Sequence, residues 1–331
     1  MFPKIIAAMV PSESGRRVFE KALALAKKAN ASLMLLHVLS PEDRRHPVMP
    51  TASIPYSYPV ITEDAIKRYQ EEQEIVGNRE LSLLQGFATE AASAGVNVEL
   101  FQKVGDPSRI ICDIARNWDA DLVVKGRQGR TGLSELLLSS VSSYVTHYVH
   151  CSVLIVQGRV KPGTGVTAEA QSEFAKILVA LENTEERQSI FDRALFLAKA
   201  SGAHLMLLHV LSPFDESYDY PMYPDPDIYP ALYDEVMKNY MPQLETFEQK
   251  GLEFLRSLRT KAMDAGVPTE LTQSLGDPGQ IICHIADTWG AELIVIGRRC
   301  RTGLNELILG SASNYVLHHA PCSVLISQRC K

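Results

Sequence analysis

The chain has 331 residues, of which 46% are hydrophobic, 22% are charged and 7% are aromatic, and its net charge at pH 7 is -6. This length suits two globular domains, and the composition is typical of a soluble protein with filled apolar cores. The negative charge disfavours nucleic acid and anionic membranes as partners. No apolar run reaches the length of a secretory signal or of a membrane span. We therefore expect a cytoplasmic protein with no nucleic-acid or membrane partner.

The predicted elements occur twice along the chain in the same order. The segment LMLLHVLSP stands at residues 33–41 and again at 205–213, a separation of 172 residues. Gly-Asp-Pro at 105–107 returns at 276–278, and CSVLI at 151–155 returns at 322–326, both at a separation of 171. A separation that changes so little indicates a tandem duplication of a whole domain.

Five short apolar runs in each copy predict strands. The runs are too short for helices and are bounded by polar or turn residues, which favours buried strands. In the first copy they are Ile5–Met9, Leu33–Leu39, Asn97–Lys103, Asp121–Lys125 and Ser152–Val156. In the second copy they are Ile177–Leu181, Leu205–Leu211, Thr269–Ser274, Glu292–Ile296 and Ser323–Ser327.

Helices are predicted between the strands. One of them, Ser189–Ala200, has apolar residues at helical spacing, with Asn183 or Thr184 as the expected cap. Asp106 and Asp277 each precede a proline at the start of a later helix, and we interpret both as N-caps. The alternation predicts an α/β fold of two tandem doubly wound, Rossmann-like domains, each a five-stranded parallel sheet flanked by helices.

The stretches between these elements suggest the domain boundaries. Residues 158–173 carry the glycine, proline and alanine of an interdomain linker, so we expect domains over residues 1–157 and 174–331. The loops after the second strand of each copy are rich in proline and tyrosine and longer than fifteen residues. Such loops are lids or binding segments, or else disordered.

The six cysteines form no Cys-x-x-Cys pair, which fits a reducing compartment. Four of them stand at equivalent positions of the two copies inside apolar runs, so we interpret them as core residues. They are Cys112 with Cys283 and Cys151 with Cys322. Cys300 and Cys330 have no counterpart.

A glycine-bearing loop follows the fourth strand of each copy. It reads GRQGRTGLSELLLSS at 126–140 and GRRCRTGLNELILGS at 297–311, and it leads into a helix that begins near Ser140 or Ser311. Ligands of open α/β sheets bind outside the carboxyl ends of the strands. A helix N-terminus there offers N–H groups and the positive end of a dipole. Because glycine permits close backbone approach, the pattern favours a phosphate site.

Together these residues resemble the universal stress protein family, of the adenine-nucleotide-hydrolase-like superfamily. The shared features include the Leu-His-Val of the second strand, Gly-Asp-Pro and Cys-Ser-Val-Leu-Ile, and both copies match over nearly their full length. Nucleotide-binding members carry Gly-x-x-Gly, nine residues, then Gly-Ser or Gly-Thr, and an aspartate that closes the first strand. The resemblance implies that this acid holds the adenosine and that the glycine loop holds the phosphates.

The first copy departs from that pattern at two positions. It keeps Gly126 and Gly129, but it has Ser139-Ser140 in place of Gly-Ser and Val10 in place of the aspartate. Valine cannot accept a hydrogen bond from a ribose hydroxyl, which costs about 1–3 kcal/mol, or roughly tenfold to a hundredfold in affinity. The first copy is therefore the weaker candidate.

The second copy keeps more of the pattern. It has Glu182 at the acid position, Gly297, and the pair Gly310-Ser311, but its second glycine is Cys300. A side chain in a phosphate loop crowds the anion and penalises positive φ, so we expect each lost glycine to weaken binding.

The resemblance implies an adenine nucleotide, ATP, as the ligand of at least one copy. In the second copy we expect Glu182 at the sugar, the backbone of Val210 near the base, and a phosphate loop that comprises Gly297, Arg298, Arg299, Cys300, Gly310, Ser311 and Ala312. The candidates in the first copy are Gly126, Arg127, Gly129, Ser139 and Ser140. The loop arginines, which include Arg130 and Arg301, either neutralise phosphate charge or form a solvated surface.

No catalytic or metal-binding set stands out. His37 and His209 are equivalent residues of the second strands, and we interpret them as satisfied core or strand-end histidines. His318 and His319 are neighbours on a helix and point in different directions, so they cannot share a metal. We expect no metal, no catalytic residue, and slow ATP hydrolysis at most.

Two functions fit the sequence. One is a stress-response regulator whose state depends on bound nucleotide. The other is a scaffold with vestigial phosphate loops, in which the tyrosine-rich loops bind another ligand or protein. Because the family commonly dimerises through its fifth strand, we also expect the copies to pack as a pseudo-dimer through Ser152–Val156 and Ser323–Ser327. The sequence leaves open whether whole chains form a homo-oligomer and which protein partners they have.

Overall fold

The computed structural model describes residues 2–10, 12–40, 63–127, 138–157, 174–182, 187–212, 230–298 and 309–328. The chain forms two compact units, Met1–Pro162 and Gly163–Arg329, which correspond to the two copies and are called unit one and unit two. The predicted linker over 158–173, the proline- and tyrosine-rich loops and the expected cap at Asn183 or Thr184 lie outside the described residues. They remain predictions.

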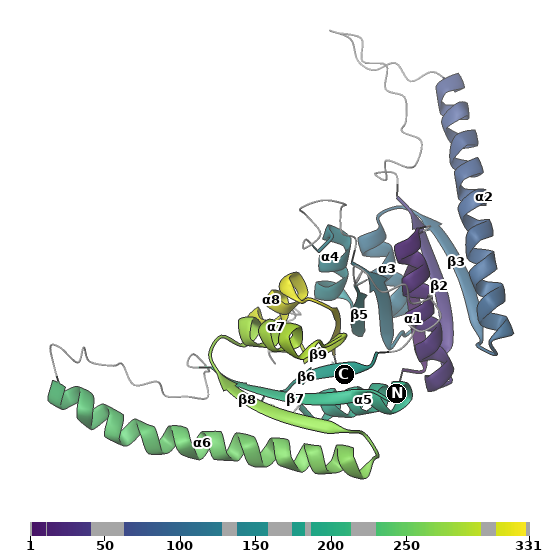
Figure 1. Cartoon of the computed structure of the whole chain (residues 1–331). Helices are drawn as coiled ribbons and strands as arrows, with labels where there is room; N and C mark the ends of the chain where they lie inside the picture. The colour runs from purple at the N-terminus through teal and green to yellow at the C-terminus, as the bar shows by residue number, and fades with distance from the viewer. Residues whose placement is uncertain are drawn as a thin grey trace, which may run out of the picture. The chain divides into compact units, whose positions relative to one another are not determined.

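Unit one is a doubly wound α/β domain (Figure 1). Its parallel sheet has the order β3-β2-β1-β4-β5. The strands are β1 (Lys4–Met9), β2 (Ser32–Leu39), β3 (Val98–Val104), β4 (Leu122–Gly126) and β5 (Ser152–Val156). The helices are α1 (Glu13–Ala29), α2 (Glu63–Ser93), α3 (Pro107–Asn117) and α4 (Ser140–Tyr148).

Unit two repeats this topology with the order β8-β7-β6-β9-β10, again with parallel neighbours. The strands are β6 (Lys176–Ala180), β7 (His204–Leu211), β8 (Thr269–Leu275), β9 (Leu293–Gly297) and β10 (Ser323–Ser327). The helices are α5 (Arg187–Ser201), α6 (Pro230–Asp264), α7 (Pro278–Trp289) and α8 (Ser311–His319). The predicted fold class and the predicted order of strands and helices along the chain are confirmed, and most strand ends differ from the prediction by one residue.

Helices cover both faces of each sheet. Right-handed crossovers place α1 and α2 on one face of unit one and α3 and α4 on the other, and α5 and α6 oppose α7 and α8 in the same way. Both long helices, α2 and α6, run well beyond the ends of the strands that they cover (Figure 1). In the described part of the chain, no helix combines the length and the apolar character that crossing a membrane requires.

Local sequence explains where several helices start. Asp106 accepts a hydrogen bond from the Ser108 N–H at 2.8 Å, and Asp277 accepts one from the Gln280 N–H at 2.9 Å. Each aspartate precedes a proline in the first turn, where the missing proline N–H costs nothing. The predicted N-cap role of both aspartates is confirmed.

The cores are built from the strands and the inner faces of the helices. Residues Ile5, Ile6 and Ala7 of β1 are completely buried, as a strand covered on both faces should be. Three of the four predicted core cysteines are buried, namely Cys112, Cys151 and Cys322. The prediction was wrong for Cys283, which is only half-buried because α7 places it at the edge of its packed face.

Candidate functional site

The candidate sites lie where the strand order reverses. In unit one the chain leaves β1 toward β2 on one side and leaves β4 toward β5 on the other, so the carboxyl ends of β1 and β4 form a topological switch point. Val10 follows β1 and Gly126 ends β4. In unit two, Glu182 and Gly297 occupy the corresponding ends of β6 and β9.

The glycine at the end of the fourth strand permits close packing of the first helix. A Cβ on Gly297 would lie 2.5 Å from the Ile190 Cδ1 of α5, and one on Gly126 would lie 3.3 Å from the Val18 Cγ2 of α1. A larger residue at Gly297 would therefore require the Ile190 side chain to move, whereas one at Gly126 would require only a small shift of Val18.

A serine of the last helix ties that helix to the same glycine. Ser142 Oγ of α4 donates to the carbonyl of Gly126 at 3.3 Å, and Ser313 Oγ of α8 donates to that of Gly297 at 2.7 Å. Both serines are buried. These bonds fix the first turn of each helix over the end of its fourth strand. The sequence analysis missed the two serines, although they stand at equivalent positions.

The two copies cap this helix differently. In unit one, Ser139 is the N-cap, and its Oγ accepts a hydrogen bond from the Ser142 N–H at 3.1 Å. In unit two, the N-cap is Gly310, which makes no side-chain cap hydrogen bond. Within the described residues, the N–H groups of Ser311, Ala312 and Ser313 have no acceptor, as expected for an open helix N-terminus.

The backbone at the cap corrects one expectation. Gly310 has φ -60° and ψ 155°, and Ser139 has φ -65° and ψ 151°, both extended. Replacing glycine by serine at this position therefore carries no positive-φ penalty, contrary to the sequence-based reasoning. The effect of Ser139 is instead that its hydroxyl takes an N–H group that a ligand would otherwise meet.

The acid position differs between the units as the sequence indicates. Glu182 directly follows Leu181, whose N–H donates to the Leu208 carbonyl at 2.8 Å, so the end of β6 is held against β7. Glu182 and Val10 are both half-buried beside their strand ends. Val210, the residue expected near a base, is half-buried on β7. Unit two thus presents a carboxylate where unit one presents a methyl surface.

The first arginine of each loop is buried, and the alternative of a solvated surface is wrong for these two residues. Arg127 donates to Gln157 Oε1 at 2.7 Å, and Arg298 donates to Gln328 Oε1 at 2.9 Å. Their exposed fractions are 8% and 1%. Burial lowers the pKa of Arg298 to about 10 because desolvation disfavours the guanidinium charge.

The remaining residues of the glycine loops lie outside the described part of the chain. They are Gly129, Arg130, Arg299, Cys300 and Arg301. The expected contribution of these residues to phosphate binding stays a prediction.

The two equivalent histidines, His37 and His209, have different hydrogen-bond partners. His37 lies between the Met9 carbonyl, 2.9 Å from Nδ1, and Glu80 Oε2, 2.8 Å from Nε2. In unit two, the Gln273 amide donates to His209 Nδ1 at 3.0 Å. Gly251 takes the place of Glu80 there, because a Cβ would clash with Gln273 and His209. The interpretation of both histidines as satisfied core residues is confirmed, whereas their partners were not foreseen.

The groups at the strand ends can hold a small ligand. Among the residues with described positions, no group of three or more histidine, cysteine, aspartate or glutamate side chains could hold a metal ion. The switch points supply helix N-termini, the carboxylate of Glu182 in unit two, and Lys125 in unit one, which lies on β4 with an exposed fraction of 6%. The fold and these ends together define a tandem α/β protein with candidate sites for small ligands at the carboxyl edge of each sheet.

Comparison with known proteins identifies the family. The model of the universal stress protein family matches residues 1–157 and again 173–328. The chain belongs to the universal stress protein family. A single copy is 40% identical over 160 residues to universal stress protein Sll1388 of Synechocystis sp., which covers 47% of this chain and 98% of that protein. Universal stress protein YxiE of Bacillus subtilis is 32% identical over 156 residues, which cover 46% of this chain and 98% of that protein.

A solved structure shares the fold over nearly the whole chain. The crystal structure of a universal stress protein from Archaeoglobus fulgidus matches with a TM-score of 0.61 at 20% identity, over 98% of this chain and 96% of that one. At this identity the likeness shows the fold alone.

Proposed function

We propose that the chain is a stress-response regulator that binds an adenine nucleotide, ATP, in unit two. Glu182 accepts hydrogen bonds from the ribose hydroxyls, and the backbone of Val210 lies beside the base. Gly297, Gly310 and Ser311 surround the phosphates. The nucleotide is hydrolysed slowly or not at all, and its presence sets the conformation or the partner choice of the protein.

The open N-terminus of α8 is the observation that carries this proposal. Its first three N–H groups have no acceptor within the described residues, and Gly310 places no side chain over them. Such groups, together with the positive end of the helix dipole, suit a phosphate. The half-buried carboxylate of Glu182 follows the neighbouring strand β6 and suits a sugar hydroxyl.

Unit one supports a different role. Ser139 caps α4 with its own hydroxyl, and Val10 supplies no acceptor for ribose. These features favour the alternative in which the first copy is a scaffold that no longer holds a nucleotide. We propose this reading for unit one alone.

Calorimetric titration of the full chain with ATP tests the proposal. Gly310→Ser should adopt the backbone conformation of Ser139 and cap α8, which removes an N–H group from the ligand. Glu182→Gln should weaken the bonds to ribose. We expect each change to reduce the affinity by about tenfold.

Ser139→Gly is the matched control, because it opens the cap of α4 without touching unit two. The control should leave the affinity unchanged. Equal affinities for wild type, Gly310→Ser and Glu182→Gln would refute the assignment to unit two. Loss of binding in a Gly126→Val variant, with Glu182→Ala unaffected, would transfer the site to unit one.

We also propose that the two copies pack as a pseudo-dimer through their fifth strands, β5 and β10. Cysteines placed in β5 and β10 at equivalent positions should cross-link readily within one chain. Absence of the cross-link under oxidising conditions would contradict the pairing.

A further inference from the structure

The strand β3 forms the outer edge of the sheet in unit one. Among the described strands of this unit it pairs only with β2, so its other side has no neighbouring strand (Figure 1). A free strand edge carries backbone N–H and C=O groups that can pair with another strand. The bonds that β3 makes to β2 show which residues supply these groups.

The even-numbered residues of β3 direct their backbone groups to the free side. The Asn97 carbonyl accepts a hydrogen bond from the Leu33 N–H at 2.8 Å, and the Gly105 N–H donates to the Leu39 carbonyl at 3.0 Å. Both odd-numbered residues therefore face β2, and the backbone groups of successive strand residues point to alternate sides. The residues whose N–H and C=O groups point away from β2 are Val98, Leu100, Gln102 and Val104.

The odd-numbered residues of β3 expose their side chains on one face. Gln102 Nε2 donates to the Gly77 carbonyl of α2 at 3.2 Å, so α2 covers the face of the even-numbered side chains. On the opposite face, α3 packs against β2. Glu99, Phe101 and Lys103 stand on that face and are exposed, and Phe101 keeps an exposed fraction of 43%. Neither charged side chain has a hydrogen bond or an ion pair with another described residue.

This face is complementary to itself when two β3 strands pair antiparallel. With a two-fold axis at Phe101, Glu99 of each chain stands opposite Lys103 of the other, and the two Phe101 rings meet at the axis. The outward-facing backbone groups then form the hydrogen-bonded pairs, which are Leu100 with Gln102 and Val98 with Val104. Phe101 falls in a non-hydrogen-bonded pair, where opposite side chains are closest.

The charges select this register. Moving the two-fold axis by one residue, to Leu100 or to Gln102, would place Glu99 or Lys103 opposite Phe101 and would remove both charge pairs. A lysine on an edge strand ordinarily opposes pairing with other strands. Here it meets an acid only when the partner is the same strand.

Unit two lacks this pattern. The residues of β8 equivalent to Glu99, Phe101 and Lys103 are Glu270, Thr272 and Ser274. The same pairing of two β8 strands would place each glutamate opposite a serine, and it would bring no aromatic rings together. The complementary edge is therefore a property of unit one.

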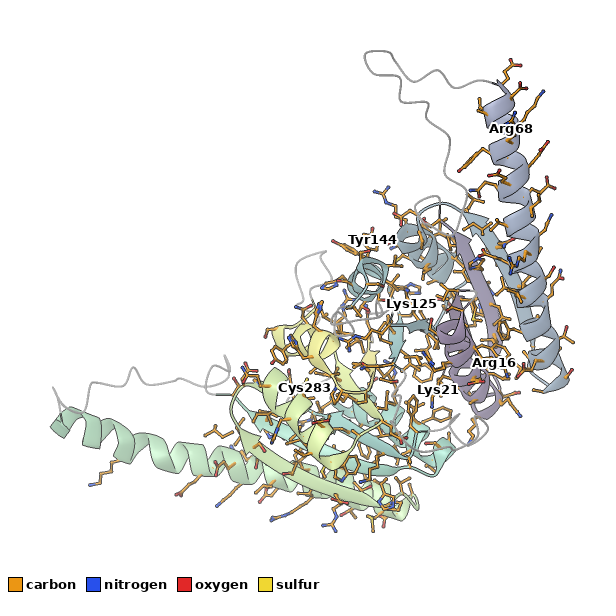
Figure 2. All side chains as sticks on the ribbon, turned by 45° about the horizontal axis from the view of Figure 1, so that its top comes forward. Arg16, Lys21, Arg68, Lys125, Tyr144 and Cys283 are labelled. Carbon is orange, nitrogen blue, oxygen red and sulfur yellow. The ribbon has the colours of Figure 1, made fainter. Side chains whose placement is uncertain are left out.

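Helix α2 presents an uncharged flank on the side of the free edge. Arg16 of α1 donates to Glu90 of α2 at 2.7 Å and 3.1 Å, and Phe19 of α1 packs on Phe87, so this flank of α2 faces α1 (Figure 2). Residues on the opposite flank follow one another at helical spacing. They are Leu81, Gln85, Ala88 and Ala92. A second α2 beside this flank would meet small or uncharged side chains.

We propose that the free edge of β3 is an interaction surface for a second copy of the whole chain, and that the two β3 strands pair antiparallel about a two-fold axis at Phe101. The product is an isologous dimer in which one sheet continues through unit one of both chains. The contact uses neither β5 nor β10, and it does not depend on the nucleotide site proposed in unit two.

Analytical ultracentrifugation of the full chain tests this proposal. We expect a dimer whose dissociation constant rises by about tenfold or more in Lys103→Glu, because both symmetric pairs then carry like charges. The double variant Glu99→Lys with Lys103→Glu restores opposite charges and should return the dissociation constant to the wild-type value. Ser274→Glu is the matched control, because it adds the same charge at the equivalent position of β8, and it should dimerise as wild type does.

Three results of this experiment would overturn the proposal. The first is a wild-type chain that stays monomeric at every concentration, which would leave the edge to a different protein. The second is an equal dissociation constant for wild type and Lys103→Glu. The third is a double variant as weak as Lys103→Glu, since the charges would then not stand opposite each other.

A disulfide across the two-fold axis provides a second readout. In a background of Cys300→Ser and Cys330→Ser, Phe101→Cys should give a covalent dimer on a non-reducing gel. A non-hydrogen-bonded pair brings its Cα atoms to about 4.5 Å, within the range of a disulfide. Thr272→Cys is the matched control on β8 and should remain monomeric. A covalent dimer with Thr272→Cys and none with Phe101→Cys would overturn the assignment to unit one.

Discussion

Replacing Glu80 by alanine should strongly destabilise unit one. The pair of Glu80 and His37 is buried, with exposed fractions of 7% and 3%. His37 Nδ1 must donate, because its partner at 2.9 Å is the Met9 carbonyl. The 2.8 Å contact between Nε2 and Glu80 Oε2 therefore also contains a proton, whichever of the two atoms carries it. Removing the carboxylate leaves a buried ring nitrogen without its partner.

The size of the effect follows from this geometry. Deleting one member of a buried pair costs about 3–5 kcal/mol. Glu80→Gln keeps a hydrogen bond, because its amide donates to Nε2 of the neutral ring, so it should cost only about 1 kcal/mol. Glu90→Ala is the control, since Glu90 pairs with Arg16 at the exposed surface and such pairs contribute less than about 1 kcal/mol.

The chain provides a reporter for each unit. The ammonium group of Lys4 lies over the ring of Trp118 in unit one, and that of Lys176 lies over the ring of Trp289 in unit two. Urea unfolding followed by fluorescence in a Trp289→Phe background therefore monitors unit one. We expect the stability to decrease in the order wild type, Glu80→Gln, Glu80→Ala. A Glu80→Ala midpoint as high as that of Glu90→Ala would refute the reasoning.

Three further predictions concern the strand ends. Gly297→Ala should lower the thermal midpoint more than Gly126→Ala, because the new Cβ at Gly297 would lie 2.5 Å from Ile190, whereas the new Cβ at Gly126 would lie 3.3 Å from Val18. Equal midpoints for the two variants would contradict this. Ser139→Ala should cost about 1 kcal/mol in urea unfolding through loss of the cap, and an unchanged midpoint would show that the cap is not needed. Lys125→Met should stabilise unit one by up to about 3 kcal/mol at pH 7, since the pKa of Lys125 falls from 10.5 to about 8 on burial. The unfolded chain binds more protons between these values, so this advantage should shrink as pH rises from about 8 to about 10.5, and a pH-independent difference would argue against it.

The fold could be predicted because its signals are local and occur twice. The apolar run that becomes β2 is long enough for one buried strand, and its repetition as β7 showed where the second domain begins. The N-caps Asp106 and Asp277 were predictable because the side chain bonds its own helix turn. Such features need no knowledge of the tertiary structure.

The site was only partly predictable, because its contacts join distant segments. The pairing of His37 with Glu80 spans 43 residues, and nothing near either residue indicates it. The buried state of Arg298 depends on Gln328 at the far end of β10. Lys125 did carry a signal, since a lysine inside a predicted buried strand must either reach solvent or meet a partner.

The role of the substituted glycine also required the structure. The sequence showed that unit one has Ser139 at the position where unit two has Gly310, but it did not show that both residues have the same extended backbone. Only the hydrogen bond from the Ser142 N–H reveals that the serine closes the helix end. The contrast between the copies is therefore one of available donors.

A crystal structure of the full chain grown with ATP tests the central claim most directly. The account predicts one nucleotide, in unit two, with its phosphates at the N–H groups of Ser311 and Ala312 and its ribose at Glu182. A nucleotide bound at the end of β4 in unit one, with unit two unoccupied at saturating ATP, would contradict the account.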